Sequence, residues 1–233
     1  MSIVKSTMPN GAVVYYRDSD HSYWKSWDAL KDTCSGRVAG ASAVSKCIGN
    51  GNVDGLLHWA VRLAKEGKDW KEEQKAKGEL GHGAHNVLEQ LARGNAVKVQ
   101  TLQERAVFDW WANPQTLDQE RIVYSPTYGV AGRFDWLGVL DPPKTTLLDL
   151  KTSTYVKPEH VIQLNLYELA RREVGYDPAD ELVILHIKDG KAYEIPVPIK
   201  PEWAVAALAI YQTGKMIRSQ LTKAEKTARV EAT

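Results

Sequence analysis

Cysteine is scarce in this sequence, with two residues, Cys34 and Cys47, among 233. Two thiols are too few for a four-cysteine zinc site, an all-cysteine iron–sulfur cluster or a disulfide framework. A chain of this length buries enough surface to fold without such crosslinks. The scarcity therefore excludes the cysteine-rich classes of protein, and the cytoplasm is the expected compartment.

Long apolar runs and an excess of charge of one sign are also lacking. No apolar stretch is long enough to cross a bilayer, and the first residues lack the apolar core of a secretory signal, so we expect a soluble protein with no membrane partner. The 30 Lys and Arg residues balance 29 Asp and Glu residues. This balance excludes nucleic-acid binding by bulk positive charge, but it permits a local basic groove. The sequence also contains no GxxxxGK[ST] loop, so no ATP is expected.

Hydrophobic periodicity divides the chain into a helical first part and an α/β second part. Residues 11–17 and 22–27 predict a β-hairpin or extended arm, and residues 41–93 and 102–112 predict helices. Strands are predicted at 117–126, 127–140 and 145–154, a helix at 158–175, strands at 181–189 and 191–198, and a long helix from residue 201. The apolar stripe of that last helix comprises Trp203, Ala207, Ile210, Ile217 and Leu221. The order predicts an α/β fold with an αβββαβ core, a central mixed sheet flanked by helices, extra N-terminal helices and a long C-terminal helix.

We expect residues 1–233 to form a single domain with three parts. Residues 1–70 form an N-terminal arm and helices, residues 71–200 the core, and residues 201–233 the C-terminal helix. No internal repeat divides the chain further.

The strand predicted at 145–154 places an acid and a base on one face. Asp149 and Lys151 are two residues apart, so their side chains leave the same face of the strand. If the preceding turn is centred near Pro142, antiparallel pairing sets Asp135 opposite Asp149. Two carboxylates about 5 Å apart are destabilising unless a positive charge lies between them. A bound cation is the simplest remedy, and neutralisation by Lys151 alone is the alternative.

Two predicted helices carry further polar side chains. His85 and Glu89 are four residues apart and share a helix face. The helix from residue 158 carries a polar stripe of His160, Gln163, Tyr167 and Arg171. Because this helix follows the Asp149 strand directly, its stripe is expected to flank the same cleft, where such groups suit phosphate or base contacts. The alternative for His85 is a surface or capped core histidine, and the alternative for the stripe of the second helix is a solvated face.

Four motifs, in this order, resemble those of the PD-(D/E)XK nuclease superfamily, and within it the RecB-type exonuclease branch found in phages. LGHGAHNVLE is similar to a glycine-to-histidine helix motif, GVAGRFDWLG to a G-x-x-D strand, LLDLKTST to a D-x-K-T strand and QLNLY to a Q-x-x-x-Y helix. The marked positions are Gly81, His85, Gly132, Asp135, Asp149, Lys151, Thr152, Gln163 and Tyr167. The resemblance covers residues 78–188 and implies a restriction-endonuclease-like core. The cluster-bearing subtype is excluded because it needs four cysteines.

The resemblance also implies metal-assisted hydrolysis of DNA with Mg²⁺ or Mn²⁺. The implied ligands are His85, Asp135, Asp149 and the main-chain carbonyl of Leu150, with Glu120 and Glu89 as further candidates. Lys151 is implied to orient or activate the attacking water, and Gln163 and Tyr167 to position the scissile strand or the lysine. Because an imidazole among oxygen ligands favours the softer ion, we expect activity with Mn²⁺ at least equal to that with Mg²⁺.

DNA contacts are expected from Gln163, Tyr167 and Arg171, and from Lys215 and Arg218 on the last helix. Glutamates interleave the basic residues, so a solvated face is the alternative for most of them. The expected activity is exonucleolytic, on linear single- or double-stranded DNA, in phage-type recombination, replication or repair. A single-strand annealing or binding protein is a partner to be considered. A structure-specific or flap endonuclease of the same fold and a non-catalytic DNA-binding module are the alternatives.

Overall fold

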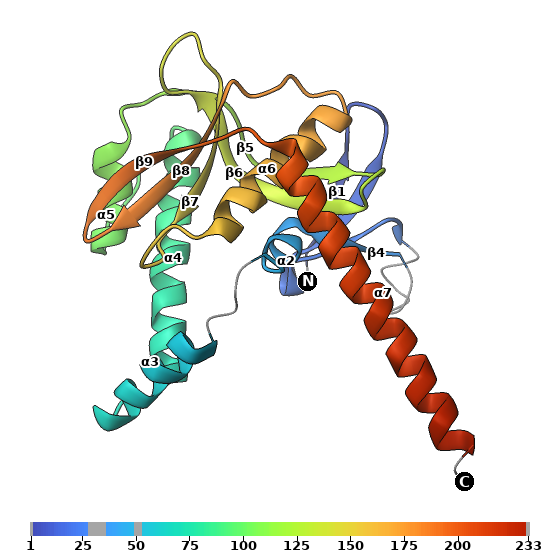
Figure 1. Cartoon of the computed structure of the whole chain (residues 1–233). Helices are drawn as coiled ribbons and strands as arrows, with labels where there is room; N and C mark the ends of the chain where they lie inside the picture. Colours follow the sequence, from blue (N-terminus) through green and yellow to red (C-terminus); the bar gives the residue numbers. More distant parts are fainter. Residues whose placement is uncertain (1, 28–35, 49–52, 232–233) are drawn as a thin grey trace.

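The computed structural model describes residues 2–27, 36–48 and 53–231 (Figure 1); Cys34 lies outside these ranges. Its strands are β1 (Ile3–Thr7), β2 (Val13–Arg17), β3 (Ser22–Trp24), β4 (Arg37–Gly40), β5 (Gln115–Ser125), β6 (Val130–Val139), β7 (Thr146–Lys151), β8 (Glu181–Lys188) and β9 (Lys191–Val197). Its helices are α2 (Ala41–Ser45), α3 (Val53–Lys65), α4 (Trp70–Ala92), α5 (Leu102–Trp110), α6 (Pro158–Glu173) and α7 (Pro201–Glu231), with a 3₁₀ turn at Asp18–Asp20.

One mixed sheet joins all of these strands in the order β1-β2-β3-β4-β6-β7-β8-β9, with β5 paired to β6. The pairs β4–β6 and β7–β8 are parallel, and the others are antiparallel. The helix α6 forms the crossover between the parallel strands β7 and β8, as a parallel connection requires. The predicted mixed α/β fold and the predicted αβββαβ order are confirmed.

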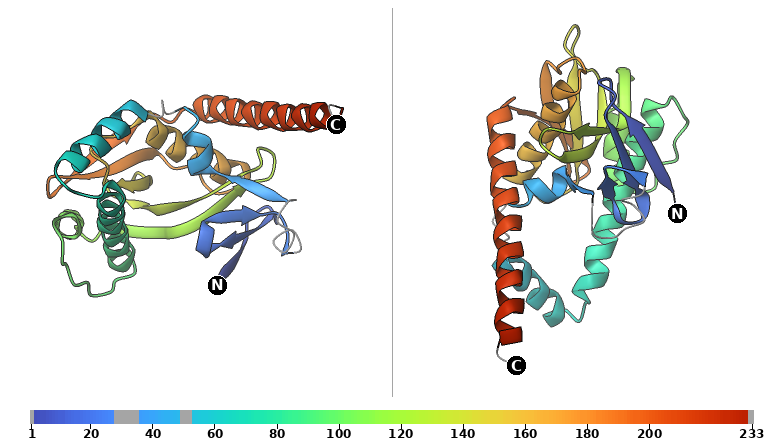
Figure 2. Two further views of the ribbon diagram at one scale, coloured as in Figure 1. Left: turned by 90° about the horizontal axis from the view of Figure 1, so that it is seen from below. Right: turned by 90° about the vertical axis from the view of Figure 1, so that its right-hand side faces the viewer.

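Helices cover both faces of the central sheet (Figure 2). Leu148 and Leu150 of β7 pack with buried residues of α4 and α5. Leu147, which directly precedes Leu148 in the strand, packs with α2, α6 and the start of α7 on the other face. This alternation follows from the two-residue period of a strand, and it supports the predicted separation of leucines from Asp149.

The N-terminal hairpin was predicted in part. β2 and β3 pair as an antiparallel hairpin, but β1 was not predicted. Residues 3–7 (IVKST) carry only a short β-prone pattern. Their strand forms through pairing with β2, and β4 then joins these strands to β6.

The ends of the predicted helices agree with glycine capping. Gly67 and Gly94 follow α3 and α4 with φ of +72° and +73°. This left-handed conformation is the one that favours glycine directly after a helix.

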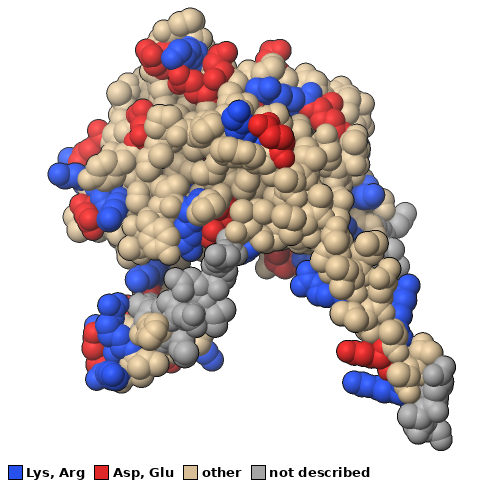
Figure 3. All heavy atoms as spheres, in the orientation of Figure 1, with Lys and Arg blue, Asp and Glu red and all other residues tan. Residues whose placement is uncertain are grey.

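Two helical projections extend from the same side of the body: α3 with the start of α4 forms one, and the second half of α7 forms the other (Figure 1). Lysine and arginine side chains lie on both projections (Figure 3). Among the described residues, no helix is both long enough and apolar enough to span a membrane.

Candidate metal centre

The candidate metal centre lies along β6, at the place where one edge of this strand changes its pairing partner. β5 pairs with one edge of β6 from Val130 to Val139. The other edge pairs with β4 at residues 130–131 and with β7 at residues 136–138. On this second edge, residues 132–135 lie in the gap between β4 and β7, and we call them the open stretch of β6. Side chains of α4 and α6 can approach the sheet there.

The register of β6 and β7 agrees with the hairpin expected from the sequence. Trp136 pairs with Leu148 and Gly138 with Thr146. Continuing this register by one residue sets Asp135 opposite Asp149, which confirms the predicted opposition of the two carboxylates.

Asp135 accepts hydrogen bonds from both neighbouring elements. Its Oδ2 accepts the backbone N–H of Leu150 at 2.6 Å. His85 of α4 places Nδ1 3.3 Å from the same oxygen. Asp135 thus ties β6 to β7 and α4, with 11% of its side chain exposed.

Glu120 adds a third carboxylate on the neighbouring strand. In the β5–β6 register, Gln119 pairs with Trp136 and Arg121 with Phe134, so Glu120 lies opposite Asp135. Ligand atoms of His85, Glu120 and Asp135 all lie within 4.8 Å of one another. Carboxylate oxygens with one imidazole nitrogen form a donor set that fits Mg²⁺ or Mn²⁺.

Asp149 and Lys151 form an ion pair beside this cluster. The Lys151 Nζ lies 2.5 Å from Asp149 Oδ2, and 2% of the Asp149 side chain is exposed. Apart from this ion pair, the buried Oδ2 accepts no hydrogen bond from the described residues, so it keeps lone-pair capacity for a cation. Asp149 can therefore serve both the lysine and a cation.

The charges of the cluster shift one another's protonation. Burial raises the pKa of Asp149, although Lys151 opposes this shift. Burial alone would also raise the pKa of Asp135, but the charge and hydrogen bond of His85 hold it below its usual value. Burial would lower the pKa of Lys151, yet the two aspartates raise it, so the lysine stays protonated at neutral pH.

Glu120 is expected to make metal binding depend on pH. Burial, aided by the Asp135 carboxylate, raises the pKa of Glu120 to about 7. Below that pKa a proton occupies the ligand, so the Mn²⁺ affinity should fall as the pH drops through about 7. Calorimetric titration with Mn²⁺ at pH values on both sides of this pKa measures the effect.

One variant and one control test whether Glu120 is a metal ligand. Glu120→Gln should weaken Mn²⁺ binding at high pH and reduce its pH dependence near 7, leaving the part due to His85, whose pKa burial lowers but the Asp135 charge raises to a net increase. Glu181→Gln, which changes an exposed partner of Lys144, should bind as the wild type does. An unchanged pH dependence in Glu120→Gln would exclude Glu120 as a ligand.

Arg133 was not singled out in the sequence. Its Nε lies 2.9 Å from Glu120 Oε2, and its guanidinium group lies over the ring of Tyr16, 5.4 Å from the centroid. The residue holds Glu120 from the side of the N-terminal strands. The sequence signal for Arg133 is its position two residues before Asp135. Its pairing with Glu120 does not follow from the sequence, because it depends on the register of β5.

Tyr167 and Gln163 of α6 lie against the open stretch of β6. The Tyr167 side chain is buried, and its hydroxyl makes a very short hydrogen bond with the Gln163 amide. Burial, with the nearby Asp149 and Asp135 charges, raises the pKa of Tyr167 well above its usual value, so the phenol stays neutral. A buried phenol does not fit the predicted DNA contact of Tyr167, whereas the partly exposed Gln163 remains available.

Gly132 is the position on β6 that admits the tyrosine. A Cβ at Gly132 would lie 2.3 Å from Tyr167 Cε1 and 3.1 Å from Ala41 Cβ. Gly81 of α4 is close in the same way to the D-x-K-T strand, because its Cβ would lie 3.0 Å from Thr152 Oγ1. Both motif glycines thus occur where a side chain of the centre approaches the backbone.

Gly132→Ala is expected to destabilise the protein, because the buried Tyr167 ring has no room to move. Overpacking of this kind lowers the free energy of unfolding by about 1–3 kcal/mol. Gly78→Ala is the matched control: no atom lies within 4 Å of its Cβ, and it lies inside α4. That change should stabilise the helix by about 0.5–1 kcal/mol. Urea unfolding of both variants measures the difference, and equal stability would contradict the packing described here.

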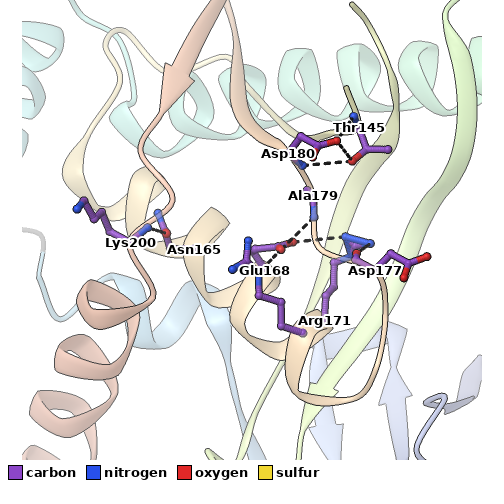
Figure 4. Close-up of polar contacts among 9 residues, drawn as sticks. Thr145, Asn165, Glu168, Arg171, Asp177, Ala179, Asp180 and Lys200 are labelled. Atoms are coloured by element: carbon purple, nitrogen blue, oxygen red, sulfur yellow. Dashed lines mark hydrogen bonds and ion pairs between the residues drawn. The ribbon is translucent and has the colours of Figure 1, made fainter. Parts of the chain in front are cut away.

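The side chain of Arg171 is buried, which does not fit the DNA contact expected from the sequence. Its Nη1 lies 3.5 Å from Glu168 Oε2, and its Nη2 donates to the carbonyl of Asp177 at 3.1 Å (Figure 4). The guanidinium group also lies 5.6 Å from the centroid of the Phe134 ring. The predicted polar stripe of α6 therefore faces the protein, and Arg171 anchors the loop before β8.

The remaining predicted residues lie farther from the cluster. Glu89 is paired with Arg93, and it is not among the three clustered ligands. Lys215 and Arg218 are exposed on the α7 projection. Whether the Leu150 carbonyl binds a metal stays a prediction, since the contact that places Leu150 is made by its N–H group.

A cavity of about 600 Å³ opens beside the cluster at the carboxyl ends of β7 and β8. His85 and Lys151 form part of its wall. The rest is lined by Lys77, Gly78, Leu80, Gln103, Leu150, Thr152, Ser153, Thr154, Ile187, Lys188 and Asp189. Lysine and hydroxyl side chains, together with Asp189 and the apolar Leu80, Leu150 and Ile187, thus line a space that adjoins the predicted ligands.

No family model matches the sequence, and no curated protein sequence matches it significantly. Among solved structures, the chain is similar to SSO0001 with 16% identity and a TM-score of 0.39, over 76% of this chain and 75% of that one. It is also similar to an alkaline exonuclease from Laribacter hongkongensis, with 11% identity and a TM-score of 0.39, over 83% of this chain and 94% of that one. These identities and TM-scores are too low to carry a functional argument, so the function proposed below rests on the side chains of the centre.

Proposed function

We propose that this chain is a divalent-metal-dependent deoxyribonuclease that degrades linear DNA from its ends. The observation that carries the proposal is the cluster of His85, Glu120 and Asp135, with ligand atoms within 4.8 Å of one another. The ion pair of Lys151 with Asp149 lies on the adjacent strand, opposite Asp135. This combination of metal ligands and a buried ammonium group suits hydrolysis of an anionic ester.

Asp135, Asp149, Glu120 and His85 are the side chains that would hold the cation. A divalent cation, when bound, lowers the pKa of a water molecule and stabilises negative charge on phosphate oxygens. Three carboxylates on adjacent strands repel one another in its absence, which favours a cation at this place. The imidazole of His85 supports our expectation that Mn²⁺ serves at least as well as Mg²⁺.

Lys151 supplies the positive charge that the chain itself contributes to the reaction. Its raised pKa keeps it protonated, and it forms part of the wall of the cavity where a phosphate would enter. A fixed ammonium group there stabilises charge that develops on the phosphate in the transition state. Asp149 orients the ammonium group through their ion pair.

Gln163 is the α6 residue proposed to contact the scissile strand. The neutral Tyr167 phenol holds the Gln163 amide, and Gly132 allows the tyrosine to occupy that position. Tyr167 is therefore a positioning residue rather than one that touches DNA.

The lining of the cavity suits a nucleic-acid strand, and the choice of a strand end over continuous DNA comes from the sequence resemblance. Lys77, Lys188 and a run of hydroxyl residues line it beside the cluster, so an anionic strand can enter there. A structure-specific or flap endonuclease of the same chemistry is the nearest alternative. A DNA-binding module without catalysis is a further alternative, which the complete set of ligands and lysine disfavours.

Linear, nicked and closed circular DNA, each incubated with the purified protein and Mn²⁺, Mg²⁺ or EDTA, distinguish these functions. Loss of linear DNA alone is the expected result and identifies an exonuclease. Cleavage of closed circles would identify an endonuclease instead. Binding without cleavage under every metal would overturn the proposal.

A further inference from the structure

The second half of α7 exposes apolar side chains that the body does not cover. Gln212 donates to the carbonyl of Tyr128 at 3.2 Å, and residues 215–229 beyond it are all exposed. Within this range, Ile217 and Leu221 are 48% and 58% exposed, and Ile210, just before it, is 52% exposed. A lone helix draws little stability from propensity alone, so such a projection gains most from a packed apolar face.

These apolar residues follow a regular heptad pattern. At alternating spacings of four and three, the helix presents Ile210, Gly214, Ile217, Leu221, Ala224 and Ala228. We call this set the α7 seam. Every member is apolar or glycine, which is the requirement for two helices to pack with knobs in holes. The seam begins just beyond Ala207, which is buried in the main core.

The charges of α7 are separated from the seam. The positions that flank it hold Tyr211, Thr213, Arg218, Gln220, Glu225 and Thr227, so one positive and one negative side chain border it. Lys215, Lys223, Lys226 and Arg229 lie on the opposite side at about 100° per residue. The flanks carry no net charge, so an identical helix meets no electrostatic repulsion there, whereas an acidic partner would require basic flanks.

We propose that the α7 seam is the surface through which two copies of this chain associate. The apolar residues of one α7 pack against those of the other, and the basic residues stay on the outside of the pair. The proposal does not depend on the nuclease function, because it uses residues outside the metal centre.

Sedimentation equilibrium of the full chain, in EDTA and free of DNA, tests the proposal. The wild type should shift from monomer towards twice the chain mass as its concentration rises. Ile217→Gln with Leu221→Gln should be monomeric where the wild type is dimeric. Glutamine retains good helix propensity, and circular dichroism checks that the body remains folded.

Lys223→Gln with Lys226→Gln is the matched control, because it changes two exposed residues on the opposite side of α7. This variant should associate as the wild type does. A wild type that stays monomeric at every concentration would overturn the proposal, as would a seam variant that still forms the dimer. Loss of DNA affinity in the seam variant without any change of mass would show that the seam binds DNA, and it too would overturn the proposal.

Discussion

Lys151→Ala should lower the rate of DNA cleavage by roughly a hundredfold to a thousandfold, the effect of removing one group that stabilises transition-state charge. The lysine is 17% exposed, at the wall of the cavity, and its pKa is raised by Asp149 and Asp135 against the opposing effect of burial. Its loss removes a permanent cation from the place where phosphate charge develops. Single-turnover cleavage of labelled linear DNA at saturating Mn²⁺ measures the rate.

Metal binding distinguishes this role from a structural one. Because Lys151 repels a cation, its removal should leave the Mn²⁺ affinity unchanged or higher, while cleavage is lost. Lys144→Ala is the matched control, since it removes an exposed lysine paired with Glu181 near the other end of the same strand, and it should cleave normally. Loss of Mn²⁺ binding together with cleavage in Lys151→Ala would contradict the assigned role.

Asp149→Asn should weaken Mn²⁺ binding by at least about tenfold and reduce cleavage to a similar or greater extent, because even the loss of a group that only supports a metal ligand costs that much. Its carboxylate is almost fully buried and lies opposite Asp135 in the register of β6 and β7. Asparagine keeps the shape of the side chain but removes the charge. Calorimetric titration with Mn²⁺ measures the affinity.

The same substitution should stabilise the metal-free protein at neutral pH. Burial raises the pKa of Asp149 above its unfolded value, so the charged form is disfavoured in the folded state. An acid with a raised pKa lowers stability at pH values above that pKa, and asparagine removes this effect. Thermal unfolding in EDTA should therefore occur at a higher temperature for Asp149→Asn.

For the metal-binding prediction, an unchanged Mn²⁺ affinity of Asp149→Asn would contradict the assignment of Asp149 as a ligand.

The sequence predicted the local part of the centre well. The opposition of Asp135 and Asp149 depends on one short hairpin, whose register follows from the position of its turn. His85 was predicted by the motif of its helix, and the structure brings it to Asp135. Such contacts are set by short stretches of chain or by a regular helix face.

The sequence did not indicate several contacts between distant elements. Helical periodicity placed Arg171 on one face with Gln163, but it did not show that this face is turned to the sheet and to Asp177. The pairing of Arg133 with Glu120 requires the register of β5 and β6, and β1 is stabilised by pairing with β2. Side-chain burial in such cases is decided by tertiary packing rather than by local pattern.

Release of acid-soluble nucleotide from linear double-stranded DNA is the most direct test of the proposed nuclease centre. The wild type should release nucleotide with Mn²⁺ and none with EDTA, and Asp149→Asn should release little with either. No release by the folded wild type with Mn²⁺ or Mg²⁺, or equal release by Asp149→Asn, would contradict the assignment of this centre as a metal-dependent nuclease.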